Sequence, residues 1–416
     1  MMWLLFACSN DSTSDFPTNN STEPSSEQVE DSVTYYQDVA PILATNCVSC
    51  HREEGSGPFV LDTYEMVKAT AGMIEDSVTT RRMPPFHVDN SGDCHSFEHS
   101  PWLSEDEIST IATWVANDTP EGTVADISYP SFEEAPFEGT HSVTFEPYNA
   151  DFATAADDYR CFIVDPQVET EGFLTGFEVL PSNRAIAHHM ILYAPASDTA
   201  LEQAYDLDEA DSGPGYACYG DPRVDNRMIA PWAPGSDQWF YPDGTGVRME
   251  KDQILILQMH YSNASEETLD STTVNLNITD SIDKELYTSF FVNSSIAIPP
   301  GETEHLEKTK RTVESFSGYN GPLVLHAMGP HMHKLGVSGS ASLTKNGEES
   351  CLMDVPYYDF NWQRVYTYSE TVTLQPDDLF ELNCTYDSTS QSETVQWGDG
   401  TGDEMCLMTV FASLPQ

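Results

Sequence analysis

The sequence predicts a multidomain chain in which a small all-α domain precedes two antiparallel β-sandwich domains. Two changes of pattern along the 416 residues predict this order. Residues 33–121 carry apolar side chains at helical spacing, whereas short apolar runs separated by turn sequences fill residues 141–416. A break at SSIAIPPGE divides the β region near residue 296. A chain of this length can hold three separate cores.

The first 32 residues resemble an export signal followed by a tether. Residues 1–8, MMWLLFAC, resemble the end of a bacterial lipoprotein signal in which Cys8 is the lipidated residue. Residues 9–32 are rich in Ser, Thr, Asn, Asp and Glu, as disordered tethers are. The sequence holds no run of about eighteen apolar residues. We therefore expect an exported protein, periplasmic or at the cell surface, with a lipid anchor as its only membrane contact.

The charge balance excludes two classes of partner. The 17 Lys and Arg residues face 68 Asp and Glu residues, which leaves a formal charge of −51. Nucleic acids and anionic membrane surfaces are bound by basic clusters, so we expect neither as a partner. The acidity indicates a strongly solvated surface, and it would steer a cationic substrate inward.

In the predicted α domain, residues 47–51 form the sequence CVSCH. C-x-x-C-H is the attachment pattern of a c-type haem, with Cys47 and Cys50 as thioether donors and His51 as an iron ligand. A zinc site would need a second Cys/His pair nearby, and a redox dithiol would need a βαβ context; the sequence indicates neither. The pattern therefore predicts a covalent haem.

Met83 is the expected second axial ligand of the haem iron. The two prolines that follow it prevent a helix and favour an extended loop that presents the sulfur. His87 is a competing ligand. Met66 and Met73 lie at helical spacing and are expected in the core.

One amphipathic helix is expected before the CxxCH motif and another after it. TYYQDVAPILATNC precedes it, and LSEDEISTIATWVAND follows, with Ser104 and Glu107 as a capping box. The order of helix, CxxCH, Met-Pro-Pro loop and closing helix resembles class I cytochrome c domains over residues 33–121. This resemblance implies the same four haem ligands. The expected buried positions are Val39, Ile42 and Leu43 in the first helix and Ile108, Ile111, Trp114 and Val115 in the second.

The remaining chain is expected to be β structure. Residues 122–140, acidic and with Pro, Gly and Ser but no periodicity, are the expected linker. Four later runs are typical of strands: GFLTGFEVL, DQILILQMHY, GPLVLHAM and CLMTVFASL. Turn sequences such as PDG, PPG, KNG and GDGTG separate the apolar runs. The pattern predicts sandwich domains over residues 141–295 and 296–416.

Histidines in this β region are candidate metal ligands. In GPHMHKLG, His331 and His333 would lie on one face of a strand, because side chains alternate. An isolated pair of this kind is more often unrelated to metal. The adjacent His188 and His189 point to opposite faces of a regular strand and meet one metal only at a bulge or strand end. His260 closes the run DQILILQMHY, where a lone histidine is more often a hydrogen-bonded core residue.

With Met405 in the sequence GDEMC, these histidines form two groups of three. Met405 alone would ordinarily be a core residue. Three imidazoles suit copper in either oxidation state, whereas two imidazoles and a thioether favour Cu(I), the state that reacts with O2. Zinc does not select methionine. The groups are His188, His189 and His260 in one half, and His331, His333 and Met405 in the other.

The sequences HHM, QMHY, HMH-x-LG and DEMC resemble, in order and approximate spacing, those of the copper type II ascorbate-dependent monooxygenases, the peptidylglycine α-hydroxylating and dopamine β-monooxygenase-like family. The resemblance covers about residues 140–415. It implies two jelly-roll-like β-sandwich domains that face each other across an open cleft, with one copper in each. It also implies that the three-histidine copper stores electrons, while the copper beside Met405 binds O2 and substrate.

Cysteine usage also indicates export. Apart from residues 1–8 and the CxxCH pair, six cysteines remain, an even number that is typical of disulfides in exported proteins. Their spacing does not give the pairing. The pairs that the family resemblance implies are Cys161–Cys218 and Cys384–Cys406, and Cys94 and Cys351 stay unassigned.

Two further features follow from the family resemblance. The segment DYRC matches a family segment and implies that Tyr159 lies beside the copper ligands, and Gln258 is a further candidate for that position. Peptide-amidating members carry an Arg two residues before HxH and a Tyr four after the Met ligand, and both bind the peptide carboxylate. Gly329 and Thr409 stand at these positions here, which argues against a peptidylglycine substrate.

We therefore expect an exported copper-dependent monooxygenase with two copper ions and a c-type haem. On the family resemblance, it inserts one oxygen atom of O2 into a C–H bond of a small organic substrate. The haem would relay electrons from an external donor, either an ascorbate-like reductant or a redox protein. The alternative is a non-enzymatic haem and copper protein for electron transfer or copper binding. In a third hypothesis the β domains bind a partner and carry no copper.

Overall fold

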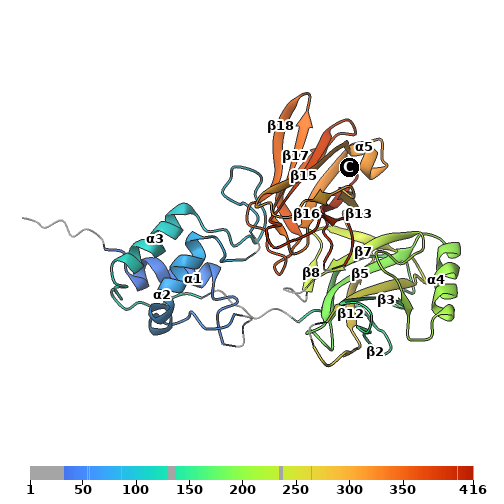
Figure 1. Ribbon diagram of the computed structural model, residues 1–416, viewed down its shortest axis with the longest axis horizontal. Coiled ribbons are helices and arrows are strands. Elements are labelled where there is room, and N and C mark those ends of the chain that lie inside the picture. The colour runs from blue at the N-terminus through green and yellow to red at the C-terminus, as the bar shows by residue number, and fades with distance from the viewer. Residues whose placement is uncertain are drawn as a thin grey trace, which may run out of the picture.

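The computed structural model describes residues 32–53, 55, 57–85, 87–129, 136–233, 238–263, 265–400 and 402–415. Cys8 and the expected tether up to residue 31 lie outside these ranges. Figure 1 shows three units, which we call the helical unit (residues 33–121), the first β unit (residues 141–279) and the second β unit (residues 284–415). No helix in the described ranges is long and apolar enough to cross a membrane.

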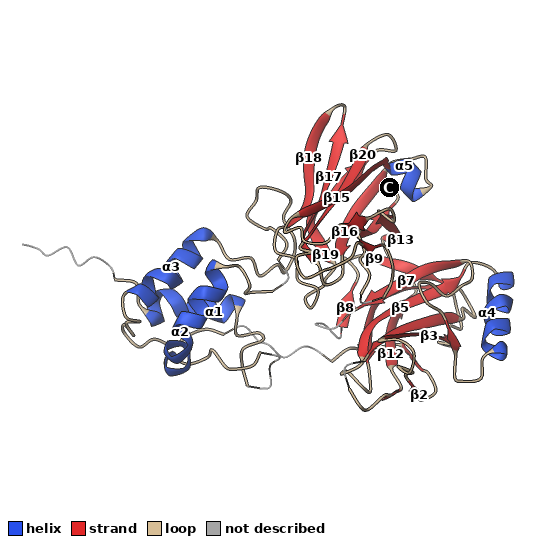
Figure 2. Cartoon of the chain, viewed as in Figure 1, coloured by secondary structure: helices blue, strands red, loops and turns tan. Residues whose placement is uncertain are grey.

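Helices gather in the helical unit, and strands dominate the rest of the chain (Figure 2). Its closing helix begins with the predicted capping box: the amide of Glu107 donates to Oγ of Ser104 at 3.2 Å, and the amide of Ser104 donates to the Glu107 carboxylate at 2.8 Å. Trp114 of the same helix is fully buried. The helices are the π-helical turn η1 (Tyr35–Val39), α1 (Ala40–Asn46), α2 (Tyr64–Thr79) and α3 (Glu105–Ala116).

The prediction that two methionines of α2 lie in the core is wrong. Met66 is 38% exposed and Met73 is 56% exposed. Each methionine directly precedes a core residue, Val67 or Ile74, and one residue is a rotation of about 100° around a helix. The buried face of α2 consists of Val67, Ala71, Ile74 and Val78.

The largest sheet contains nine of the described strands and runs through both β units. Its order is β1 (His141–Thr144), β12 (Thr273–Thr279), β4 (Gly172–Leu180), β9 (Thr245–Met249), β13 (Lys284–Val292), β22 (Leu407–Ser413), β16 (Leu323–His331) and β19 (Tyr366–Leu374), with β8 (Gln238–Phe240) beside β4.

Each β unit adds a smaller sheet of its own. In the first β unit the order is β6 (Tyr216–Ala217), β3 (Asp157–Val164), β10 (Leu255–Ser262), β5 (Ala187–Pro195) and β7 (Asn226–Trp232). In the second it is β15 (His305–Thr312), β20 (Leu379–Tyr386), β17 (Gly336–Lys345) and β18 (Glu348–Val355). Two short pairs join β2 (Tyr148–Asn149) to β11 (Leu269–Asp270) and β14 (Ala297–Ile298) to β21 (Val395–Gln396).

Each β unit is a two-layered structure around an apolar core, and the core of the first unit extends to Leu286, Ala327 and Phe411 of the second. In the first β unit, Leu174 of β4 and Leu257 of β10 are fully buried in one cluster, so the two layers pack face to face. In the second, Leu325 of β16 and Leu382 of β20 do the same. The four runs predicted as strands form β4, β10, β16 and β22, and the predicted β-sandwich layers agree with this arrangement.

One parallel strand pair joins the two β units. β9 and β13 pair at Thr245 with Lys284 and at Gly246 with Glu285, whereas the other described ladders are antiparallel. β13 also pairs with β22 from Leu286 to Val292. The predicted break near residue 296 therefore falls after β13, a strand of the shared sheet that pairs with β22 of the second β unit.

Two helices of the β region were not expected from the sequence. α4 (Asp198–Ala210) begins at Ser197, whose Oγ accepts the amide of Ala200 at 3.2 Å. Its only buried residues are Ala200 and Ala204, so its apolar face is narrow and its periodicity is weak. α5 (Val313–Ser317) is a single short helix in the second β unit.

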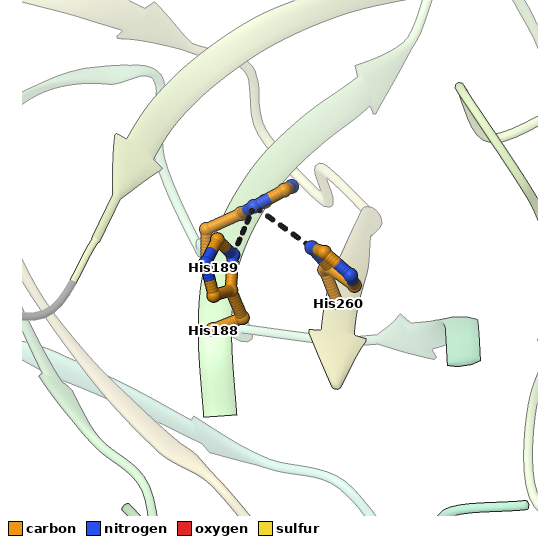
Figure 3. A group of neighbouring side chains, drawn as sticks. All are labelled: His188, His189 and His260. Carbon is orange, nitrogen blue, oxygen red and sulfur yellow. Dashed lines mark hydrogen bonds between the residues drawn. The ribbon is translucent and has the colours of Figure 1, made fainter. Parts of the chain in front are cut away.

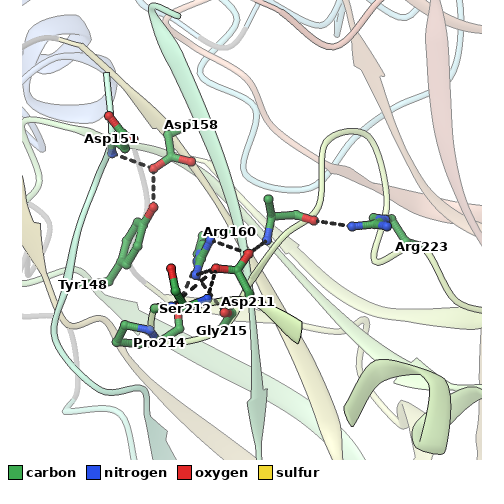
Figure 4. Close-up of polar contacts among 11 residues, drawn as sticks. Tyr148, Asp151, Asp158, Arg160, Asp211, Ser212, Pro214, Gly215 and Arg223 are labelled. Carbon is green, nitrogen blue, oxygen red and sulfur yellow. Dashed lines mark hydrogen bonds and ion pairs between the residues drawn. The ribbon is translucent and has the colours of Figure 1, made fainter. Parts of the chain in front are cut away.

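An ion pair fixes β3 of the first β unit (Figure 4). The guanidinium of Arg160 donates to both carboxylate oxygens of Asp211, at 2.8 and 3.2 Å, and to the carbonyls of Pro214 and Gly215. The hydrogen bond from Arg160 is the main cause that lowers the pKa of Asp211. Because Arg160 is buried, its charge requires these acceptors.

We predict that Asp211→Asn lowers the free energy of unfolding by about 2 kcal/mol at pH 7, because a hydrogen-bonded charge is lost. A lowered pKa means that this contribution is present above the ordinary carboxyl pKa of about 4 and is lost as the pH falls through the folded-state value. Urea unfolding at pH 7 and pH 3 measures both. Asp206→Asn, on the exposed side of α4, is the control. A difference from wild type that stays equal at the two pH values would contradict the prediction.

Candidate metal centres

A β-bulge brings the adjacent histidines of the first β unit together. His260 of β10 pairs with His189 of β5, but the next residue, Tyr261, pairs with Ala187. The register skips His188, which is the irregularity that two neighbouring histidines need in order to reach one point. Nitrogen atoms of His188, His189 and His260 lie within 4.8 Å of one another.

The three rings present the same nitrogen to one another (Figure 3). Nδ1 of His189 lies 3.3 Å from Nδ1 of His188 and 3.2 Å from Nδ1 of His260. Nε2 of His260 lies 2.9 Å from Oδ1 of Asp157, so we assign its proton to Nε2 and a lone pair to its Nδ1. Nitrogens that converge in this way fit a bound cation.

Of the two residues expected beside these ligands, Tyr159 contacts His260 from the neighbouring strand β3, whereas Gln258 lies on β10 itself and hydrogen-bonds to Cys218. The ring of Tyr159 stacks on His260 with centroids 4.1 Å apart, and its hydroxyl donates to the carbonyl of Asp399 in the second β unit at 2.6 Å. Gln258 is buried, and its amide donates to the carbonyl of Cys218 at 2.8 Å. Tyr159 therefore links one histidine directly to the opposite unit.

The second group lies where β16 ends. His331 is the last residue of the strand and His333 follows it, so the strand is shorter than predicted. The two rings still meet, with centroids 5.2 Å apart, while Met332 between them is buried on the other side. The HxH spacing thus brings the rings together even though His333 lies beyond the strand.

In the second group, hydrogen bonds leave the lone pair on a different ring nitrogen than in the first group. Nδ1 of His331 contacts the side-chain oxygen of Gln363, and Nδ1 of His333 lies 3.0 Å from the carbonyl of Asp403. Both partners accept, so each Nδ1 carries the proton and each Nε2 has the free lone pair. The first group therefore offers Nδ1, and the second offers Nε2.

All five rings are neutral at pH 7. Burial lowers the pKa of His188 to about 3 and that of His189 well below its ordinary value, and it also lowers the pKa of His260. Burial lowers the pKa of His331 to about 3 and lowers that of His333 as well. A neutral imidazole keeps the lone pair that a metal requires.

A buried carboxylate joins the HxH turn to Met405. Glu404 is 1% exposed and accepts the amides of His333 at 2.8 Å, Leu335 at 2.7 Å and Met405 at 3.3 Å. Burial raises the pKa of Glu404 to about 7, and the three amide donors oppose this shift. One side chain thereby sets the position of two predicted ligands relative to each other.

The backbone of Met405 is held from both sides. The hydroxyl of Tyr386 donates to its carbonyl at 2.7 Å, and the next residue, Cys406, is bonded to Cys384. Cys161 and Cys218 form a second disulfide, so both pairs that the resemblance implied are present. The third disulfide joins the two unassigned cysteines, Cys94 and Cys351.

The two groups face a shared cavity of about 850 Å³ between the β units. His189 of the first group and His331, His333 and Met405 of the second line it. The ring of Phe360 contacts His188 and His333, with centroid distances of 4.9 and 5.9 Å. Phe360 therefore contacts one ring of each histidine group. The aromatic wall includes Phe177, Trp232, Trp239, Tyr241 and Phe290.

The CxxCH segment folds as a turn after α1. Cys47 and Cys50 are the free cysteines of the described chain, and the amide of His51 donates to the carbonyl of Cys47 at 2.9 Å. Nδ1 of His51 lies 2.9 Å from the carbonyl of Phe59, which leaves Nε2 with the lone pair. Burial raises the pKa of Cys47 to about 12, which is unlike a reactive dithiol.

The other two candidate iron ligands lie beyond α2. Met83 is half-buried, and its amide donates to the carbonyl of Ser77 at 3.1 Å. His87 lies against the second β unit instead, with Nδ1 2.6 Å from the carbonyl of Tyr357.

Several residues around the histidines were not foreseen from the sequence. Asp157 shares the face of Tyr159 on β3, because the two are two residues apart, and this spacing was a usable signal. Gln363 and Phe360 come from an irregular segment between β18 and β19, where no periodicity marks a functional side chain. Glu404 lies within DEMC, but only the fold shows that it accepts three amides.

Two β units that present histidine groups to one cavity define a paired-site protein of β-sandwich architecture. Residues 143–268 match the family described as copper type II ascorbate-dependent monooxygenase, N-terminal domain, and residues 286–411 match its C-terminal domain. The chain belongs to the copper type II ascorbate-dependent monooxygenase family. Neither match includes the helical unit.

Curated relatives are similar to this chain in sequence. DBH-like monooxygenase protein 2 of Mus musculus is 27% identical over 284 residues, which cover 63% of this chain and 44% of the relative. DBH-like monooxygenase protein 1 of Gallus gallus is 26% identical and covers 53% and 38%. Dopamine beta-hydroxylase of Bos taurus is 24% identical and covers 60% and 43%. This chain thus spans less than half the length of each of these relatives.

Solved structures resemble this chain only weakly. The major capsid protein P2 from bacteriophage PM2 covers 62% of this chain and 98% of its own, with a TM-score of 0.28 and 8% identity. A likeness at this level carries no argument.

We predict that Glu404→Ala lowers the free energy of unfolding of the metal-free protein by at least about 3 kcal/mol, because three buried amides lose their acceptor. Urea denaturation measures this change. Asp403→Ala is the matched control. Among the described residues, its partly exposed carboxylate accepts long bonds of 3.3 Å from Tyr219 and Gly400, so the substitution should cost less than about 1 kcal/mol. Equal losses in the two variants would contradict the role assigned to Glu404.

Proposed function

We propose that this chain is an exported copper monooxygenase that hydroxylates a C–H bond of a small organic substrate with O2. The supporting observation is the pair of neutral histidine groups that face one cavity, with Met405 lining the cavity beside the second group. Membership of the family supplies copper as the metal.

The residues present fit two copper ions of different character. His188, His189 and His260 would hold an electron-storing copper through three Nδ1 atoms. His331, His333 and Met405 would hold the copper that binds O2, and the thioether favours Cu(I). When bound, copper supplies one-electron storage and the reduction of O2. The protein fixes the rings through Asp157, Gln363 and the Asp403 carbonyl.

The helical unit fits a covalent c-type haem that relays electrons. Two unbonded thiols flank a turn, and the adjacent His51 has its Nδ1 engaged by a carbonyl, which leaves Nε2 for iron. Cys47 and Cys50 would form the thioethers, and Met83 would be the second axial ligand. An external reductant, either ascorbate-like or a redox protein, would supply electrons to the haem.

The cavity favours a neutral or cationic aromatic substrate. Its charged lining consists of Glu98, Asp221, Asp243 and Asp399 against Arg364 among the described residues. A side chain at position 329 would be crowded, because a Cβ on Gly329 would lie 3.0 Å from the carbonyl oxygen of Arg364. The carboxylate grip of peptide-amidating relatives is therefore missing at this place.

The disulfides support export, since such bonds persist in oxidising compartments. A periplasmic or cell-surface location with a lipid on Cys8 completes the proposal.

The rival hypothesis is a haem and copper protein without a substrate. A cavity of about 850 Å³ beside the Met405 group favours the monooxygenase hypothesis over this rival, because an electron carrier has no need for an aromatic-walled space at the metal.

The test is incorporation of label from ¹⁸O2 into an aromatic ethylamine, with an arylpropionic acid of equal length as the comparison. We expect one labelled atom in the amine product and little reaction of the acid. Met405→Ile should lower the rate by more than about 100-fold, since even residues that only orient a metal ligand cost about 10–100-fold. Met408→Ile, in the nearby core, is the control.

Labelled product from the Met405→Ile variant at the wild-type rate would contradict the assigned role. The same preparations should hold haem that stays attached under denaturing conditions. Wild-type chain without attached haem, made in cells that mature c-type cytochromes, would remove the haem relay from the proposal.

A further inference from the structure

One segment of the helical unit is built into the second β unit. Residues 87–100, which we call the strap, lie between α2 and α3 in the chain and leave the helices to reach the second β unit (Figure 1). Val88 is fully buried and Phe97 is 3% exposed, and both belong to the core of the second β unit. Val78 before the strap and Leu103 after it belong to the core of the helical unit.

The strap pairs with the edge of the nine-stranded sheet. The amide of Glu98 donates to the carbonyl of Thr367 at 2.8 Å, and the amide of Ser369 donates to the carbonyl of Ser96 at 2.9 Å. β19, which holds Thr367 and Ser369, is the last strand in the order of that sheet. The strap thus covers backbone groups that an edge strand would otherwise expose. At its other end, the amide of Asp89 donates to the carbonyl of Asp354 at 2.7 Å.

Covalent and aromatic contacts hold the strap in place. Cys94 is bonded to Cys351 of β18, across 257 residues of sequence. The rings of Phe97 and Tyr368 lie 4.8 Å apart, and those of His95 and Tyr368 lie 5.4 Å apart. A disulfide that closes so long a loop restricts the unfolded and undocked chain strongly.

The strap also reaches the His331 group. His87 lies around one small hollow with Pro330 and Gln363, and Gln363 contacts Nδ1 of His331. At the opposite end of the strap, Glu98 and His99 line the shared cavity. His87 is four residues after Met83, so the expected iron ligand is joined by a short piece of chain to the surroundings of His331.

We propose that the strap fixes the helical unit on the second β unit. The docked helical unit then delivers electrons to the centre formed by His331, His333 and Met405 rather than to the three-histidine centre. The proposal rests on the proposed function for the presence of haem and copper. In each transfer, one electron would pass from haem iron to the copper held by His331, His333 and Met405, which would go from Cu(II) to Cu(I), and the external reductant would replace the electron.

The first test measures docking without reference to either metal. Amide hydrogen exchange of the full chain follows Asp89, Glu98 and Ser369, which we expect to be protected in the wild type. The strap-release variant combines Cys94→Ser, Cys351→Ser and Phe97→Ala, and exchange at these amides should become about 100-fold faster. Phe97→Ala with the disulfide intact is the milder variant and should accelerate exchange less. Asp93→Ala, at the exposed tip of the strap, should leave exchange unchanged.

The second test measures which copper receives electrons. His260→Ala removes a ligand of the first centre, and His331→Ala removes a ligand of the second. Stopped-flow absorbance follows the reoxidation of pre-reduced haem. In the His260→Ala protein, reoxidation should be fast, and strap release should slow it at least about 10-fold. In the His331→Ala protein, reoxidation should be slow whether or not the strap is released.

Two results would overturn the proposal. One is rapid exchange at the strap amides of the wild type, and the other is haem reoxidation that is indifferent to strap release or faster through the three-histidine centre. A chain that carries no haem would end the proposed relay instead, and amide exchange would still decide whether the strap docks.

Discussion

Neutral imidazoles at fixed positions are the constraint on which the site depends. A ring can offer a lone pair to a metal only while it is unprotonated, and burial lowers the pKa of the histidines in both groups far enough to ensure this at pH 7. Burial alone does not choose the nitrogen. Asp157 engages Nε2 of His260, whereas Gln363 engages Nδ1 of His331, so acceptors placed by the fold decide which atom faces the centre.

Several independent features of the surrounding structure hold the imidazoles in position. The bulge at His188 turns a strand position that would point away into a member of the group. In the second group, Glu404 fixes the backbone of His333, and the Cys384–Cys406 disulfide fixes the backbone next to Met405. The parallel pair of β9 and β13 makes one sheet of both β units, and the hydroxyl of Tyr159 reaches the second unit, so the two groups face each other across a defined space.

Local patterns in the sequence correctly predicted features that depend on neighbouring residues, namely strands and a helix cap. The four apolar runs became strands, and the Ser104–Glu107 capping box formed, because period-two alternation and helix capping depend on near neighbours. Met66 and Met73 were misplaced because a buried helical face and its flank differ by one residue. Phe360 and Gln363 lie in an irregular segment that only the tertiary fold brings to the histidines. The Cys94–Cys351 pair likewise joins units that no sequence pattern relates.

The most direct test of this account is the copper content of the purified chain, by elemental analysis of the wild type beside the His260→Ala and His331→Ala variants. The account predicts two copper ions per chain in the wild type and one in each variant, because each substitution removes one imidazole from one group only. A wild-type chain with no copper, or with one copper that both substitutions remove, would contradict the existence of two separate facing centres.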